Sequence, residues 1–450
     1  MPKDHEAFQQ AIYSFLEEGA TDGLRRSLQE VHPADIAEMF PVLSLAQRVK
    51  LLRIMDPEQA SLVLFELDRE MLPPLIESLG FNRTADILDA MSTDDAADLL
   101  GNLPGGIKQK LLDLMETQEA EDVAELLEYA EDTAGGIMTT EFVAIHQDIT
   151  AERAIQLLRE IAPDAETVYY VYVVNRQAQL VGVISLRELI LAAPAMLIEE
   201  IMRRKVISVN VNTDQEEVAK LVAKYDFLAV PVVNDNNELL GIITVDDVLD
   251  VIEEEATEDM MRMAANIDVD EQGPDAGALR RASRRLPWLI GLLFGELIAG
   301  HVIEGFSGTL QNMTALAFFM TALAGGTGNA ATQSLTVVVR GIATGEVNPR
   351  QVFKVVWGEA QVGLFIGLTS GLVLAGLALL WQDSLSLGLV VGASLALSIT
   401  LSTILGSLVP VIINRFGIDP ALASGPFIAT LMDVTSMFIY FSLATLILVR

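Results

Sequence analysis

The sequence Phe427-Ile428-Ala429-Thr430-Leu431-Met432-Asp433-Val434-Thr435-Ser436-Met437-Phe438-Ile439-Tyr440 decides the class of fold, because it places an acidic residue inside a long apolar segment. No other charged residue occurs from Pro420 to Val449. An ionised carboxylate near the middle of a bilayer costs at least about 2.5 kcal/mol, so a binding partner must offset that cost. A cation on a transport path is the simplest partner. The alternative is a protonated acid that hydrogen-bonds to Thr or Ser inside a helix bundle.

Charge divides the chain into two parts. Residues 1–275 contain 20 Lys and Arg against 55 Asp and Glu, a net charge of −35, whereas residues 276–450 contain 9 against 7. The first part is therefore predicted to be a soluble acidic assembly that attracts cations and does not bind nucleic acid. The chain contains no Cys, which excludes thiolate metal sites and disulfides. The polar start, Met1 to Glu6, contains no signal peptide, so we expect the amino-terminal half to stay in the cytoplasm.

Long uncharged stretches in the second part predict a membrane domain. A membrane-spanning helix needs about 20 apolar residues, and we expect five spans at residues 287–306, 313–339, 354–381, 385–413 and 421–449. Basic residues cluster on one side of the membrane: Arg280, Arg281, Arg284, Arg285, Arg340, Arg350, Lys354 and Arg415. Because cytoplasmic loops carry the excess of Lys and Arg, this pattern predicts a cytoplasmic amino terminus and an external carboxyl terminus.

The soluble part has two patterns. From Asp22 to Glu131, short apolar-periodic runs follow capping residues, as in His32-Pro33, Asp56-Pro57 and Ser92-Thr93, which indicates a small helical solenoid. A duplication follows it. Val171-Tyr172-Val173-Val174-Asn175 and Gly182-Val183-Ile184-Ser185 recur 59 residues later as Val230-Pro231-Val232-Val233-Asn234 and Gly241-Ile242-Ile243-Thr244. Each copy predicts helix, strand, turn, strand and helix, and is preceded by an Ile-Met pair.

Acidic residues gather on the helices predicted in this soluble part. Asp247, Asp250, Glu254 and Glu258 form one helical stripe, with Glu255 and Asp259 at its edge. Asp94 and Asp98 form a second group, and Asp214, Glu216 and Asp226 a third. Solvated helix faces are one interpretation. The other is that these groups repel one another across domain boundaries unless a divalent cation lies between them.

The duplicated unit resembles a tandem pair of CBS domains, and the order of the whole chain resembles the MgtE family of magnesium channels. The most specific segments are Glu131 to Thr139, Thr244 to Asp250, Glu255 to Asp259, Asp419 to Ala421 and Ala429 to Thr435. The resemblance implies a multidomain, homodimeric protein of the inner (cytoplasmic) membrane that is not an enzyme. Its expected parts are an acidic superhelical domain (1–131), two α/β CBS domains (132–200 and 201–257), a connecting plug helix with its linker (246–280) and a five-helix all-α transmembrane domain (281–450).

The resemblance also implies binding residues. Asp433 is expected in the pore with Gly328, Asn329 and Pro426. Mg²⁺ ligands are expected at Asp94, Asp98, Asp214, Glu216, Asp226, Asp247, Asp250, Glu255, Glu258 and Asp259, with backbone carbonyls from Gly136 and Ala223. ATP is expected near Tyr170, Arg187, Glu188 and Phe227. The sequence departs from the family pattern at Ala331 and at Gly425, where Gly and Asn are common.

These expectations combine into one mechanism and two alternatives. Mg²⁺ passes beside Asp433, with two copies meeting on a two-fold axis, and the glycine-containing segments Gly325 to Asn329 and Gly425-Pro426 interrupt their helices to free carbonyl groups. Internal Mg²⁺ bridges the acidic groups and holds the connecting helix against the pore, so that the ion limits its own entry. The alternatives are a proton-coupled transporter of divalent cations such as Co²⁺ or Mn²⁺, using Asp433 and Glu359, and a CBS-containing membrane sensor.

Overall fold

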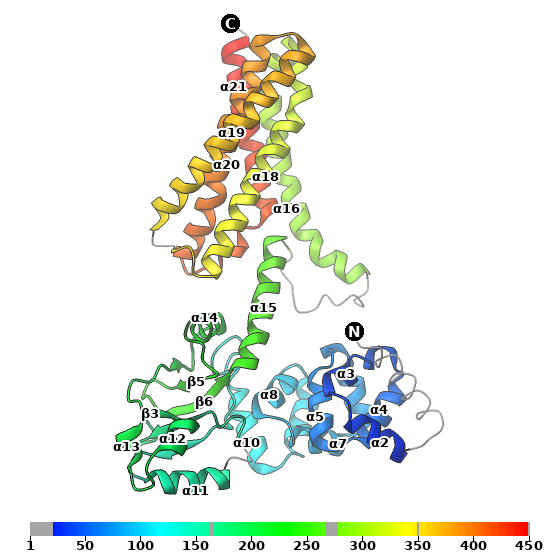
Figure 1. The fold of residues 1–450 in the computed structure, drawn as a ribbon. Coiled ribbons are helices and arrows are strands. Elements are labelled where there is room, and N and C mark those ends of the chain that lie inside the picture. The colour runs from blue at the N-terminus through cyan, green and yellow to red at the C-terminus, as the bar shows by residue number, and fades with distance from the viewer. Residues whose placement is uncertain (1–20, 162–164, 266–277, 349–350, 449–450) are drawn as a thin grey trace. The chain divides into compact units, whose positions relative to one another are not determined.

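The computed structural model describes residues 21–161, 165–265, 278–348 and 351–448 (Figure 1). The chain forms two compact units, Met1–Ile252 and Glu253–Arg450. The boundary between them falls inside one helix, α15 (Val245–Met263).

The first unit begins with a stack of short helices. Most helices contact the next but one along the chain, as in α3 with α5, α4 with α6, α5 with α7, and α7 with α9. Such contacts are typical of a solenoid and agree with the helical pattern of the sequence. The helices are α2 (Thr21–Gln29), α3 (Pro33–Ala37), α4 (Leu45–Ile54), α5 (Pro57–Phe65), α6 (Leu72–Leu79), α7 (Phe81–Leu88), α8 (Thr93–Gly101), α9 (Gly105–Leu112) and α10 (Thr117–Leu126).

The predicted capping residues start the helices that they precede. Asp56 accepts a hydrogen bond from the backbone N–H of Gln59 at the start of α5, and His32 accepts one from Ala34 at the start of α3. Ser92 occupies the same position before α8, but its side chain accepts no capping hydrogen bond. Side chains that accept from the first turn satisfy backbone donors that the helix leaves unpaired, so these helices begin where the sequence predicts.

The duplication folds into two three-stranded sheets of the same order. The first contains β1 (Ala144–His146), β2 (Tyr170–Val174) and β3 (Leu180–Ser185), and the second contains β4 (Val209–Asn210), β5 (Ala229–Val233) and β6 (Leu239–Thr244). In each sheet the first pair of strands is parallel and the second antiparallel. The strands from the repeated sequence are confirmed, whereas the short strands β1 and β4 were not predicted. The helices are α11 (Ala151–Ile161), α12 (Leu186–Leu191), α13 (Ile198–Ile201) and α14 (Gln215–Tyr225).

The segment before each copy packs on the sheet of the other copy. Thr139 pairs with Ile242 of β6, and a Cβ on Gly241 would lie 2.8 Å from the Met138 sulfur. Correspondingly, Arg203 pairs with Val183 of β3. The Ile-Met pairs of the sequence are therefore the crossing points that bind the two copies together. The core of the helical stack continues into the second copy through residues such as Val230, Val232 and Ile243.

Within its described residues, the second unit is helical, and five long helices follow the end of α15. They are α16 (Ala278–Gly305), α18 (Ala317–Ala343), α19 (Val352–Gln382), α20 (Leu385–Arg415) and α21 (Gly425–Leu448), with the short α17 (Ser307–Asn312) after α16. Among the described residues, four segments are long and apolar enough to cross a membrane: Ala282–Gly305, Val352–Gln382, Leu385–Arg415 and Gly425–Leu448. The second predicted span, α18, has the length but is not among these four.

The expected interruption at Gly325 to Asn329 is wrong, because α18 runs continuously through it. Small residues there serve close packing instead. A Cβ on Gly328 would lie 3.3 Å from that of Ala429 on α21, and one on Gly406 of α20 would lie 2.3 Å from the Ala331 carbonyl oxygen. Helices that approach this closely need residues without bulk at the contact. The last helix begins at Gly425, after the turn η6 (Pro420–Leu422), rather than at residue 421 as predicted.

Candidate metal sites

Three carboxylates meet in the first unit. Asp94 and Asp95 lie in the first turn of α8, and Asp247 lies in the first turn of α15. One oxygen from each lies within 4.8 Å of the others. Asp94 is only 7% exposed, and its Oδ1 is buried with no hydrogen-bond partner in the described structure. A buried charged oxygen without a donor is costly, so this arrangement favours a cation among the three side chains.

Hydroxyl groups fix the two helices that carry the cluster. The Thr244 hydroxyl and backbone N–H both donate to Asp247 Oδ2, which orients that carboxylate. On the other side, Thr93 Oγ1 lies 3.2 Å from the Thr139 hydroxyl and 3.1 Å from that of Thr140. The hydroxyl of Thr93 also accepts from the Thr140 backbone N–H. These contacts hold the start of α8 against the segment that leads into the first repeat.

The electrostatics of the cluster are unfavourable in the absence of a cation. Burial, followed by the charge of Asp94, raises the pKa of Asp95 to about 8. Burial also raises the pKa values of Asp94 and Asp247. Burial and the charge of Glu166 raise the pKa of Glu141 to about 7. Each shift means that the folded protein resists ionisation of these groups, as expected for carboxylates that share a partly dry site.

The sequence named two of the three cluster residues and missed the third. Asp94 and Asp247 come together as the metal-site expectation requires, but Asp98 is exposed on α8 and is not in the group of three. Asp95 takes its place. Its position next to Asp94 in the Thr93-Asp94-Asp95 turn was a usable signal, but such acids also favour helix starts for local reasons. Glu141 and Glu166 also surround the cluster, and neither belongs to a charge pattern on a helix.

The other expected ligands of the soluble part lie apart from this cluster. Asp214 is the N-cap of α14 and accepts from the Glu216 N–H, whereas Asp226 ends the same helix in a left-handed conformation. The 1.5 Å rise per residue puts these two about 18 Å apart, so within one chain they do not form a single group. Glu216 pairs with Lys220 at 2.7 Å, and Ala223 is exposed on α14. Gly136 packs so closely on Ala130 that a Cβ would lie 2.3 Å from its carbonyl oxygen.

Further along α15, the acidic stripe ends in an ion-paired basic residue. Arg262 contacts Glu258 one turn earlier and also Asp419, which precedes the turn η6 (Pro420–Leu422) in the second unit. Met263 packs against the apolar cluster of α18 and α21. Glu255, Glu258 and Asp259 are half-buried, and Asp250 is exposed. Glu258, an expected Mg²⁺ ligand, is therefore engaged with Arg262 here.

The acidic residue of the last helix has a neighbour that the sequence did not assign to it. Asp433 of α21 lies within hydrogen-bonding reach of Glu296 on α16. The two helices approach closely one turn away, where a Cβ on Gly295 would lie 2.3 Å from Thr430. The expected pore residue Asn329 is exposed on α18, Gly328 is buried, and Pro426 lies in the first turn of α21. Two carboxylates at one point of a membrane helix pair can bind a cation or share a proton.

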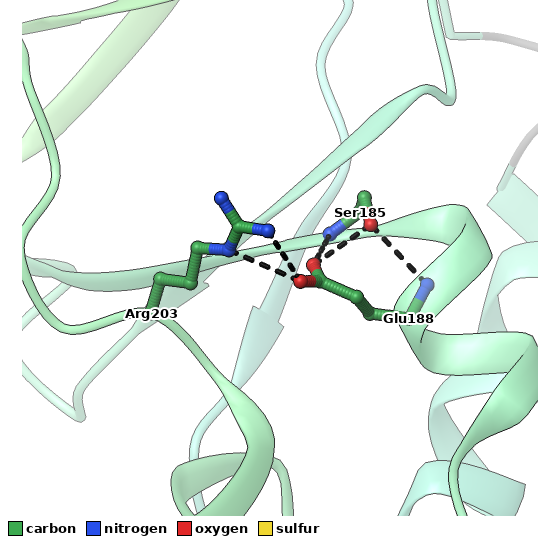
Figure 2. Close-up of polar contacts among 3 residues, drawn as sticks. All are labelled: Ser185, Glu188 and Arg203. Carbon is green, nitrogen blue, oxygen red and sulfur yellow. Dashed lines mark hydrogen bonds and ion pairs between the residues drawn. The ribbon is translucent and has the colours of Figure 1, made fainter.

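The residues expected to bind ATP lie in the two repeats. Figure 2 shows that Glu188 is held by structural contacts: it accepts from Ser185 in a capping box and forms an ion pair with Arg203 at 2.6 Å. These donors hold the pKa of Glu188 below its ordinary value. Arg187 is exposed, Tyr170 is half-buried, and Phe227 stacks on Tyr225 with ring centroids 5.4 Å apart. Glu188 thus orients the start of α12, while the other three remain accessible at least in part.

Known proteins resemble this chain along nearly its whole length. The profile of the MgtE intracellular N domain matches residues 31–132, CBS domains match residues 134–195 and 198–254, and the MgtE divalent cation transporter profile matches residues 320–443. The magnesium transporter MgtE of Bacillus subtilis is 39% identical over 96% of this chain and 96% of its own length. The chain belongs to the MgtE family. MgtE of Thermus thermophilus is 40% identical over 97% of this chain and 98% of its own length.

Two solved structures match the soluble part of this MgtE chain. The cytosolic domain of the Mg²⁺ channel MgtE, solved in complex with ATP, has a TM-score of 0.52 and 42% identity, and covers 54% of this chain and 98% of its own. The soluble part of a magnesium transporter has a TM-score of 0.53 and 38% identity, and covers 56% and 99%. The family identity and the CBS repeats inferred from the sequence are therefore confirmed.

Proposed function

We propose that this MgtE protein carries Mg²⁺ across the cytoplasmic membrane as a homodimer of five-span chains, and that internal Mg²⁺ reduces the flux by binding to the acidic cytosolic part. The amino terminus lies inside and the carboxyl terminus outside. Two relatives that match nearly the whole chain are magnesium transporters, which supports the transport step. The regulatory step rests on the carboxylates of Asp94, Asp95 and Asp247.

The unpartnered Oδ1 of Asp94 is the observation that carries the regulatory proposal. Mg²⁺ takes oxygen ligands and keeps several of its water molecules, so two or three carboxylates are an adequate set of protein ligands. The cluster joins α8 of the helical stack to the start of α15. A cation bound there neutralises carboxylates that otherwise repel one another, and so stabilises the contact between these two segments.

The transport path is proposed beside Asp433. Its neighbour Glu296 adds a second carboxylate from α16, so each chain of the homodimer offers two carboxylates to a divalent ion on the path. Asn329, Gly328 and Pro426 are proposed to line the same path. We further propose Asp98, Asp214, Glu216, Asp226, Asp250, Glu255, Glu258 and Asp259, with the Gly136 and Ala223 carbonyls, as weaker Mg²⁺ ligands in the dimer. Several weak sites acting together give a steep response to Mg²⁺.

The end of α15 provides the proposed connection between the cytosolic part and the membrane helices. Arg262 fastens this helix to Asp419, and Met263 packs near the start of α21. Mg²⁺ that fixes the first turn of α15 through Asp247 then favours one position of the whole helix. A ligand shifts such an equilibrium only if it binds one position of the helix more tightly than the other. The distance between the carboxylates of α8 and that of α15 sets this difference in affinity.

Flux measurements in proteoliposomes test the proposal against its alternatives. Mg²⁺ uptake without a pH gradient, reduced by Mg²⁺ on the cytosolic side, supports it. Uptake that requires a pH gradient would indicate a proton-coupled transporter of divalent cations instead. No flux of any divalent cation would indicate a sensor. Parallel measurements with Mg²⁺, Co²⁺ and Mn²⁺ identify the preferred ion.

Nucleotide binding is a second proposed activity of the cytosolic part. The matching cytosolic domain was solved in complex with ATP, which supports ATP binding between the repeats of this chain near Tyr170, Arg187, Glu188 and Phe227. Titration calorimetry with ATP and with AMP tests it. Binding of ATP that Arg187→Gln weakens supports the site, and absence of heat with both nucleotides contradicts it.

A further inference from the structure

A basic hollow on the helical stack contains none of the residues proposed to bind Mg²⁺ or nucleotide. It has a volume of about 820 Å³ and lies where the ends of α4 and α6 meet the start of α7 and one side of α9. Its lining contains three basic side chains and no acidic one. The lining residues are Arg53, Leu79, Gly80, Phe81, Asn82, Arg83, Lys110 and Leu114.

The charge of this hollow contrasts with the domain around it. Residues 21–131 contain 23 Asp and Glu against 9 Lys and Arg, a net charge of −14. Three of the nine basic residues nevertheless converge on one hollow, and none of the 23 acidic residues lines it. Within the described residues, neither Arg53, Arg83 nor Lys110 forms an ion pair with a carboxylate. In a strongly acidic domain, three basic side chains that converge without a carboxylate partner favour an anionic partner.

Packing holds the three side chains in place. Arg53 Nη2 donates to the carbonyls of Ser78 and Leu79, and Arg83 Nη2 donates to those of Leu52 and Met55. The Lys110 ammonium lies 3.5 Å from the centre of the Phe81 ring. The two guanidinium groups are thus anchored through one nitrogen each. Their remaining donors and the Lys110 ammonium are not consumed by these contacts.

The helix that starts at this hollow adds to its positive potential. Gly80 precedes α7 with no side chain to accept from the first-turn N–H groups. Arg83, in the first turn of α7, has an Nε that is buried with no acceptor in the described structure. The positive end of the α7 dipole therefore adds to the three cationic side chains, while carbonyl groups at the ends of α4 and α6 pair with Arg53 and Arg83.

We propose that this hollow binds a small, multiply charged oxyanion, recognised through Arg53, Arg83 and Lys110. Phosphate and carboxylate groups share the chemistry required, which is a cluster of acceptor oxygens with negative charge. The sites for Mg²⁺ and the proposed nucleotide site use other residues, so this inference does not depend on the transport proposal. If the three basic residues only fasten helix ends, the hollow will bind no anion.

Titration calorimetry on the full-length protein in detergent tests the proposal. The probes are inorganic phosphate, pyrophosphate and citrate, each titrated in metal-free buffer against a chloride control of equal ionic strength. Lys110→Gln removes one charge from an exposed side chain, so the fold is expected to be intact, and Lys110→Arg restores the charge. Lys108→Gln, on the same helix but outside the hollow, is the matched control. Arg187→Gln tests whether the anion binds instead at the proposed nucleotide site between the repeats.

The expected result is binding of pyrophosphate or citrate that weakens about tenfold in Lys110→Gln, as for loss of one charge-assisted hydrogen bond. Lys110→Arg, Lys108→Gln and Arg187→Gln should retain it. Arg53→Gln is a second variant, expected to weaken binding similarly. Comparison of the pyrophosphate and citrate titrations tells phosphate from carboxylate recognition. Absence of heat with all three anions, binding that Lys110→Gln and Arg53→Gln leave unchanged, or binding that only Arg187→Gln removes would overturn the proposal.

Discussion

Asp94 on α8 and Asp247 on α15 present carboxylate oxygens within 4.8 Å of each other, although the two repeats separate them in the sequence. Asp95 completes the group. Two ionised carboxylates at this separation repel each other, and burial strengthens the repulsion. A cation is the simplest means of holding the two helices together at neutral pH.

Asp247→Asn should separate the repulsion between the carboxylates from their binding of Mg²⁺. Removing one charge relieves repulsion, so we expect the metal-free protein to melt higher, by roughly 2–4 °C for each kcal/mol relieved. The same change removes a metal ligand, so stabilisation by Mg²⁺ should fall. Thermal melting with and without Mg²⁺ measures both effects. Asp235→Asn makes the same charge change at an exposed position and should alter neither. A wild-type response to Mg²⁺ in Asp247→Asn would contradict the assignment.

The stability of the metal-free protein should fall as pH rises from about 5 to 8. Burial raises the pKa of Asp95 to about 8 and that of Glu141 to about 7, so the folded protein retains protons that the unfolded chain releases above its lower, ordinary pKa values. Stability is therefore lost as pH rises through the folded-state values. Mg²⁺ replaces these protons and should stabilise more at pH 8 than at pH 6. Melting curves across this range, with and without Mg²⁺, check the prediction; equal Mg²⁺ effects at both pH values would contradict it.

Asp433→Asn should lower Mg²⁺ flux at least about tenfold, because a neutral amide no longer balances the charge of the ion. Glu296→Gln should also lower the flux, because it removes the second carboxylate proposed for the path. Proteoliposome uptake with a Mg²⁺-sensitive dye measures both variants. Asp383 lies between two membrane helices in a left-handed conformation that Asn tolerates, so Asp383→Asn is the matched control. Full flux through Asp433→Asn would remove this residue from the path.

Arg262→Gln should weaken closure by internal Mg²⁺. The substitution breaks the contacts of α15 with Asp419 and Glu258, and the loss of about 1 kcal/mol corresponds to a roughly fivefold higher Mg²⁺ concentration for half-maximal inhibition. Flux measured at a series of Mg²⁺ concentrations on the cytosolic side gives the concentration for half-maximal inhibition. Arg340→Gln removes an exposed charge at the end of α18 and should leave it unchanged. An unaltered midpoint in Arg262→Gln would show that its ion pairs play no part in closure.

The sequence predicted those parts of the fold that follow from local pattern. Repeated strands around Val173 and Val232, helix starts at Asp56 and Ser92, and long apolar helices in the second part are confirmed because spacing and capping act over a few residues. The continuity of α18 was not predicted. Gly325 to Asn329 look like a break in isolation, but neighbouring helices at Gly328 and Ala331 favour close packing of an unbroken helix.

The candidate sites were predictable only in part. Asp94 and Asp247 were expected as ligands through the family resemblance, whereas Asp95, next to Asp94, was missed because acids at a helix start also have local roles. Glu296 becomes a neighbour of Asp433 only through tertiary packing. The basic hollow was missed for the same reason. Arg53, Arg83 and Lys110 lie on three different helices, and no charge run connects them in the sequence. The charge pattern along one helix does not show which residues of other helices lie close to it in the fold.

Mg²⁺ flux into proteoliposomes, measured while Mg²⁺ on the cytosolic side is clamped at a series of concentrations, tests whether the carboxylates of Asp94, Asp95 and Asp247 sense internal Mg²⁺. Wild-type flux should fall steeply as this concentration rises. In the triple variant Asp94→Asn, Asp95→Asn, Asp247→Asn, the flux should remain high over the same range, because the carboxylates that bind the ion are absent. An identical decline in the wild type and the variant would show that the cluster does not sense Mg²⁺.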